Sequence, residues 1–77
     1  MKIRLFDAMI DQKYGVTVYE LQREVREELL VNMREWCCET FGISTKHRYI
    51  PAKWKQSFGT FYFITEKQRT LFLLRWS

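Results

Sequence analysis

The chain has 77 residues, of which 47% are hydrophobic and 17% aromatic, and its formal net charge is +4. This length predicts one domain over residues 1–77, with a small core rich in aromatic side chains. The longest strictly apolar run, Leu71–Leu74, is far shorter than the ~20 residues that cross a bilayer. Asp7 and Asp11 interrupt any signal peptide, so we expect a cytoplasmic protein without a membrane span.

Charge is divided unevenly along the chain. Residues 1–42 hold six Lys or Arg and eight Asp or Glu, whereas residues 43–77 hold seven Lys or Arg and one acid, Glu66. This asymmetry predicts that the C-terminal part contributes a basic surface that attracts anions. The alternative is that both parts are ordinary solvated surface.

The N-terminal segment predicts a strand followed by a turn. Lys2–Phe6 alternates polar and apolar side chains, which is the period of a half-buried strand. Asp11–Gly15 is polar and ends in a glycine, which favours a turn.

Residues 18–41 predict a long helix. Thr17 and Glu20 have the spacing of a capping box, and Gly42 stands where a left-handed residue ends a helix. Apolar side chains recur every three or four residues, which predicts one face packed in the core. The members of this stripe are Val18, Leu21, Val25, Leu29, Met33, Trp36, Cys37 and Thr40 or Phe41.

The segment after the helix is less regular. Residues 43–57 show no clear period, and Pro51 excludes a helix interior, so we expect a loop or an edge strand. Thr60–Ile64 follows, and its aromatic and β-branched residues predict a central strand.

The last element has two interpretations. Thr65 and Gln68 repeat the capping-box spacing, which favours a short helix over 66–74; alternatively, 71–76 returns as a strand beside 60–64. The predicted fold class is α+β, with a small antiparallel sheet and one long helix packed on one face. The expected order, β-α-β-β-α, is related to a ferredoxin-like arrangement lacking its last strand.

The residues that carry catalytic or metal chemistry are sparse. Cys37 and Cys38 are neighbours, which disulfide geometry disfavours, so we expect reduced thiols. The sequence has no second cysteine pair that would indicate a zinc site. A cysteine nucleophile needs a base beside it and a third group that positions the base, and the single histidine, His47, lies beyond the helix end, about ten residues after Cys37 and Cys38. We therefore expect no enzyme activity, no metal and no cofactor.

One segment combines basic and aromatic side chains. Its candidate partner-binding residues are Lys46, Arg48, Tyr49, Lys53, Trp54 and Lys55. Trp, Tyr and Arg anchor protein interfaces, whereas cations and aromatic rings also contact phosphates and bases. The remaining alternative places Tyr49 and Trp54 in the core while the lysines face water.

Several strings of the C-terminal part resemble a group of phage proteins. These are Glu35–Gly42, Trp54, Gly59–Phe63 and Leu71–Ser77. Together they resemble small uncharacterised proteins of tailed bacteriophages, which show a helix ending in Trp-Cys…Phe-Gly, an aromatic strand and a closing Phe-x-Leu-Arg-Trp. The resemblance implies no activity or site, but it implies a short protein that binds a host or viral macromolecule.

Three functions follow from these features. The first hypothesis is a phage-type binding protein in the host cytoplasm that modulates a host or viral protein by contacting its acidic surface. The second is nucleic-acid binding. The third is a minor structural or virion component, or a homo-oligomer that completes its own small core.

Overall fold

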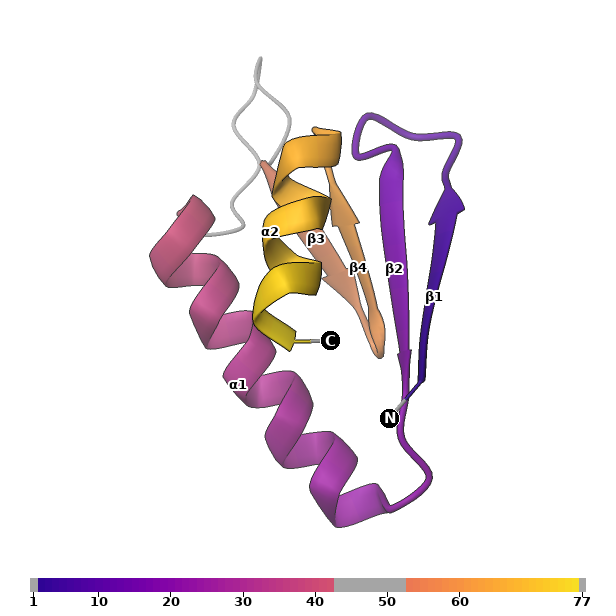
Figure 1. Cartoon of the computed structure of the whole chain (residues 1–77), viewed down its shortest axis with the longest axis vertical. Helices are drawn as coiled ribbons and strands as arrows, with labels where there is room; N and C mark the ends of the chain where they lie inside the picture. Colours follow the sequence, from indigo (N-terminus) through magenta and orange to yellow (C-terminus); the bar gives the residue numbers. More distant parts are fainter. Residues whose placement is uncertain (1, 43–52, 77) are drawn as a thin grey trace.

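The computed structural model describes residues 2–42 and 53–76. Its elements in chain order are β1 (Lys2–Asp7), β2 (Tyr14–Tyr19), α1 (Arg23–Phe41), β3 (Trp54–Ser57), β4 (Thr60–Phe63) and α2 (Glu66–Trp76) (Figure 1). The predicted α+β class is confirmed. The order is β-β-α-β-β-α, however, so the expected β-α-β-β-α order is wrong by one strand.

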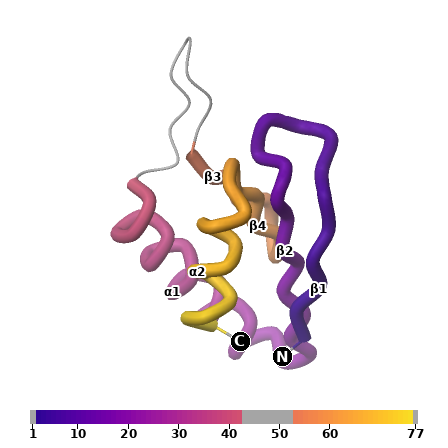
Figure 2. The backbone as a smooth tube through the Cα atoms, turned by 45° about the horizontal axis from the view of Figure 1, so that its top comes forward, coloured from indigo at the N-terminus to yellow at the C-terminus, as the bar shows by residue number. Residues whose placement is uncertain are grey.

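The four strands form one antiparallel sheet with the order β1-β2-β4-β3. β4 is a central strand, as its aromatic sequence predicts, and β3 is an edge strand. Figures 1 and 2 show both helices on the same side of the sheet. The opposite side is covered by no element of the described ranges, so the fold has two layers.

The core lies between the sheet and the two helices. Its buried residues come from every element except β1, and they are Val16, Val18, Met33, Cys37, Trp54, Phe61, Phe63 and Phe72. The Phe72 ring of α2 lies 5.0 Å from that of Phe61 and 5.4 Å from that of Phe63, measured between centroids. Aromatic packing of this kind gives a short chain much buried area per residue.

The first expected capping box is part of a strand instead. Val16 and Val18 are buried at alternate positions of β2, and β-branched residues suit this pleated, packed surface. The Thr17 hydroxyl lies 3.4 Å from that of Thr60 on β4. α1 therefore begins at Arg23, several residues later than predicted, and Gln22 precedes it without a side-chain cap.

The apolar stripe of α1 is buried only toward its C-terminal end. Met33 and Cys37 are fully buried, whereas Leu21, which precedes α1, is 100% exposed and Val25 is also exposed. Figure 1 shows the first turns of α1 running past the end of α2, where no second layer covers them. The prediction that the whole stripe packs in the core is therefore wrong for Leu21 and Val25, and Val18 is buried as a residue of β2 rather than of the helix.

The helix ends follow the predicted chemistry more closely. The Gln68 N–H donates to the Thr65 Oγ1 at 3.2 Å, while the Thr65 N–H donates to the Gln68 Oε1 at 3.1 Å. This reciprocal capping box confirms the C-terminal helix and excludes the alternative strand. At the end of α1, Gly42 has φ 93°, and its N–H donates to the Cys38 carbonyl at 3.0 Å.

Candidate functional site

The candidate residues of the sequence fall into three groups. Lys46, Arg48 and Tyr49 lie outside the described residues, so their assignment stays a prediction. Lys53 and Lys55 are exposed. Trp54, between these two lysines, is 1% exposed.

Trp54 is a core residue, so its proposed role as an exposed anchor is corrected. Its indole stacks at 26° on the ring of Phe61, with centroids 6.5 Å apart. Its Nε1–H donates to the Gly42 carbonyl at 2.7 Å, which ties the end of α1 to the sheet. Side chains of a strand alternate between faces, so Trp54, paired with Phe63, points toward the helices and Lys55 points away.

The same alternation defines a second face of the sheet. We call it the open face, meaning the strand residues that project away from α1 and α2. Its members are Lys2, Arg4, Phe6, Gly15, Thr17, Tyr19, Lys55, Ser57, Thr60 and Tyr62. The pairing register arranges them in three rows that run across the strands, and successive rows are about 6.8 Å apart along the strands.

The first row holds an aromatic pair. It runs Phe6, Gly15, Tyr62, Lys55. The rings of Phe6 and Tyr62 meet edge to face, with centroids 5.7 Å apart and planes at 89°. A Cβ atom on Gly15 would lie 2.3 Å from the Phe6 ring, so glycine lets this ring lean across β2 toward Tyr62.

The second row is small and polar. It runs Arg4, Thr17, Thr60, Ser57. The two threonine hydroxyls approach to 3.4 Å in the middle of the sheet. Because these side chains are short, the centre of the open face protrudes little from the sheet. Arg4, at the β1 edge of the row, is exposed.

The third row lies at the end of the sheet where β2 finishes. Lys2 pairs with Tyr19, whose side chain is 48% exposed. Beyond β2, the turn that joins β3 to β4 closes the row, because the Val18 N–H donates to the Gly59 carbonyl at 2.8 Å. This row again combines a cation with an aromatic ring.

The strand residues of the open face carry cations without acids, whereas the helix layer carries both signs, with Glu66, Lys67, Arg69 and Arg75 on α2. Each row of the open face carries one cation (Lys55, Arg4 or Lys2), and none of its strand residues is acidic. The single acid of the described strands, Asp7, belongs to the helix side, where its carboxylate lies 3.7 Å from the Arg69 guanidinium. On the helix side, α1 carries five Glu and three Arg. The open face is therefore a positive surface on a molecule whose long helix is negative.

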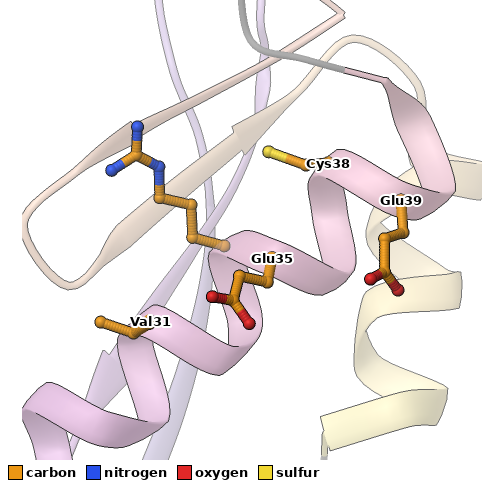
Figure 3. A pocket seen from close by; sticks show the side chains of 5 residues that line it. Val31, Glu35, Cys38 and Glu39 are labelled. Carbon is orange, nitrogen blue, oxygen red and sulfur yellow. The ribbon is translucent and has the colours of Figure 1, made fainter.

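A groove also runs along α1. Figure 3 shows side chains of α1 around a cavity of about 380 Å³, and its described lining is Val31, Arg34, Glu35, Cys38 and Glu39. Within residues 2–42 and 53–76, no three His, Cys, Asp or Glu side chains gather closely enough to hold a metal ion.

The buried thiol beside this groove is protonated at neutral pH. Burial, with a smaller contribution from neighbouring Cys38, raises the pKa of Cys37 from 9.0 to about 12. A neutral thiol is a poor nucleophile, and Cys37 packs as a small apolar residue. The expectation that the protein is not an enzyme stays a prediction.

Local sequence patterns do not predict the open face. Its aromatic and basic residues come from four strands, and one of these, β2, was assigned to a turn and a helix start. The alternation of Val16 and Val18 with Gly15 and Thr17 is the signal that indicates β2. The capping-box spacing of Thr17 and Glu20 competes with this signal, because it favours the start of a helix at the same residues.

None of the described helices meets the length and hydropathy needed to span a membrane. No protein-family model, curated protein or solved structure matches the chain. The resemblance to proteins of tailed bacteriophages therefore stays a prediction, and the function has to be argued from the open face itself.

Proposed function

We propose that this protein binds single-stranded nucleic acid across the open face of its sheet. The observation that carries the proposal is the composition of that face, which holds one cation in every row, aromatic rings in the first and third rows, and no acid among its strand residues. Basic side chains contact phosphates, and aromatic rings stack on bases.

The shape of the face favours a single strand. Four strands at about 4.8 Å spacing make a surface roughly 14 Å wide, on which unpaired bases can lie against Tyr62 and Tyr19. The low second row, with Thr17 and Thr60 at its centre, allows a backbone to approach the sheet closely. A duplex hides its bases from such a surface and offers it only phosphates.

An acidic protein surface is the competing partner. The same cations would attract it. The acidic protein partner therefore stays a prediction from the sequence, as do the roles of virion component and homo-oligomer. Nucleic acid is favoured because the aromatic rings lie among cations on an open sheet, where one ligand with both phosphates and bases can use both kinds of side chain. The burial of Trp54 removes it as an anchor for either partner.

The test measures binding by fluorescence anisotropy with labelled oligothymidylate and oligouridylate of about 15 nucleotides, from about 50 mM salt upward. A duplex of equal length and polyglutamate serve as competitors. We expect binding to single strands, with weaker competition from duplex and little from polyglutamate. Replacing Arg4 and Lys55 together by Gln should reduce the log–log salt slope by about 1.4, or about 0.7 for each lost phosphate contact.

The matched control removes the same charge from the helix layer. The double variant Arg75→Gln and Lys67→Gln, at two exposed positions of α2, leaves the open face and the β3–β4 hairpin intact, so it should keep most of the affinity and most of the salt slope. Equal losses in the two double variants would show general attraction to the net charge and contradict the proposed site. Absence of binding to any strand, together with binding to polyglutamate, would replace the proposal by the acidic protein partner.

A further inference from the structure

Phe58 occupies a position that the fold does not favour for an aromatic residue. Its φ is +55°, the left-handed region in which bulky residues are strained and Gly or Asn is common. Its side chain is 93% exposed, so packing in the core does not offset the strain. Neither the backbone nor the core explains why a phenylalanine stands there.

The turn that carries Phe58 is held firmly by its neighbours. The Gln56 Nε2 donates to the Phe58 carbonyl at 3.1 Å, and the Val18 N–H donates to the Gly59 carbonyl at 2.8 Å. Phe58 and Gly59 are the two residues between β3 and β4, where hairpins of this length require special backbone angles. The ring is therefore presented from a defined position.

That position adjoins the third row of the open face. Thr17 pairs with Thr60, and the bond from Val18 to Gly59 continues the register, which brings Phe58 to the level of Tyr19. Figure 1 shows the turn between β3 and β4 at the same end of the sheet as the start of β1, where Lys2 lies. Two exposed aromatic residues, Phe58 and Tyr19, and the cation Lys2 therefore belong to the same end of the sheet.

Space remains around the ring. A cavity of about 470 Å³ opens between the turn and α1, and its lining includes Leu30, Arg26 and Phe58 itself. Phe58 also lines a second hollow with Arg34, Trp54 and Gln56, so the ring borders the helix layer at the tip of the hairpin. Most of the ring is nevertheless accessible, and a nucleic-acid base can cover it by stacking.

We infer that Phe58 is a stacking residue, which receives a base of the bound single strand at the tip of the β3–β4 hairpin, next to the third row of the open face. This inference rests on the proposed function and adds a residue that lies outside the strands. The strained backbone at Phe58 then lowers the stability of the fold, and the residue is explained by binding rather than by folding.

The experiment compares Phe58→Asn with Phe58→Tyr. Asn suits a positive φ and removes the ring, whereas Tyr keeps both the strain and the stacking surface. We expect Phe58→Asn to unfold at the same or higher urea concentration than the wild type. Its affinity for oligothymidylate should fall at least about fivefold, and Phe58→Tyr should bind like the wild type. The salt slope should not change, because a stacked base releases no counterions.

Several outcomes would overturn the inference. Wild-type affinity in Phe58→Asn, in a protein that does bind single strands, removes the role of Phe58 and leaves the proposed function standing. A wild-type protein that binds no strand removes the proposed function, and the inference falls with it. A loss of stability in Phe58→Asn assigns the residue to folding, and a change of sedimentation from dimer to monomer assigns it to self-association.

Discussion

The two faces of the sheet are built from the same strands, yet they differ in almost every property. On the helix side, Val16 and Phe61 are fully buried, whereas Thr17 and Thr60, one residue away along each strand, lie on the open face. The helix side is apolar and aromatic, and its Asp7 is matched by Arg69. The open face keeps its cations without acidic neighbours in the strands. A shift of one residue along a strand therefore decides whether a side chain is buried beneath the helices or lies on the open face.

The hairpin of β3 and β4 holds one buried and one exposed aromatic residue within the five residues Trp54–Phe58. Trp54 is stacked on Phe61 and bonded to the Gly42 carbonyl, so the fold accounts for it fully. Phe58 is exposed on a strained backbone, so the fold does not account for it. Aromatic content alone thus does not identify a binding surface, because each ring has to be placed on a face first.

The largest difference between the faces should appear in stability. Phe72→Ala removes a ring that contacts Phe61 and Phe63 in the core, and it should lower the free energy of unfolding by about 3–5 kcal/mol. Tyr62→Ala on the open face loses the edge contact with Phe6 and should cost about 0.5–1.5 kcal/mol. Urea unfolding followed by circular dichroism measures both. Equal costs would contradict the division into a buried face and an open face.

The second prediction concerns the close approach on the open face. Gly15→Ala places a Cβ atom 2.3 Å from the Phe6 ring, which has to move, so we expect a loss of about 1–3 kcal/mol. In a Phe6→Ala background the obstacle is gone, and the same substitution should cost much less. Urea unfolding of the four proteins gives the coupling energy. A coupling energy near zero would show that the Phe6 ring does not lie over β2.

The third prediction is a pH dependence of the buried face. The pKa of Cys37 is raised to about 12, above its ordinary value of 9.0. The stability that comes from burying the neutral thiol is therefore complete below about pH 9 and is lost as the pH rises toward 12. The wild type should lose up to about 1.4 kcal/mol per pH unit above pH 9 relative to Cys37→Ala.

Urea unfolding between about pH 7.5 and 10.5 measures this difference. Cys38→Ala is the matched control, because it retains Cys37 and should keep the slope of the wild type. Parallel curves for the wild type and Cys37→Ala would show that the thiol is not shielded from water, which would weaken the assignment of this stretch of α1 to the core.

Local patterns predicted the elements whose signals lie within a few residues. The bonds between Thr65 and Gln68 make α2, and the aromatic run Thr60–Phe63 makes β4. The same kind of pattern was misleading at Thr17, because its hydroxyl faces Thr60 on a neighbouring strand, and a local signal carries no information about that neighbour. The pattern therefore predicts a helix start where β2 ends, and its residues are not recognised as part of a sheet face.

By itself, the sequence determined the α+β class, the capped C-terminal helix, the central aromatic strand and the excess of cations in the C-terminal part. Only the tertiary structure decided which residues share a face, because the register between strands joins positions far apart in the chain, such as Gly15 and Tyr62. It also decided that Trp54 is buried while Phe58 is exposed, since burial depends on whether a helix lies over that side of the sheet. The candidate site is a product of this pairing, and no single segment contains it.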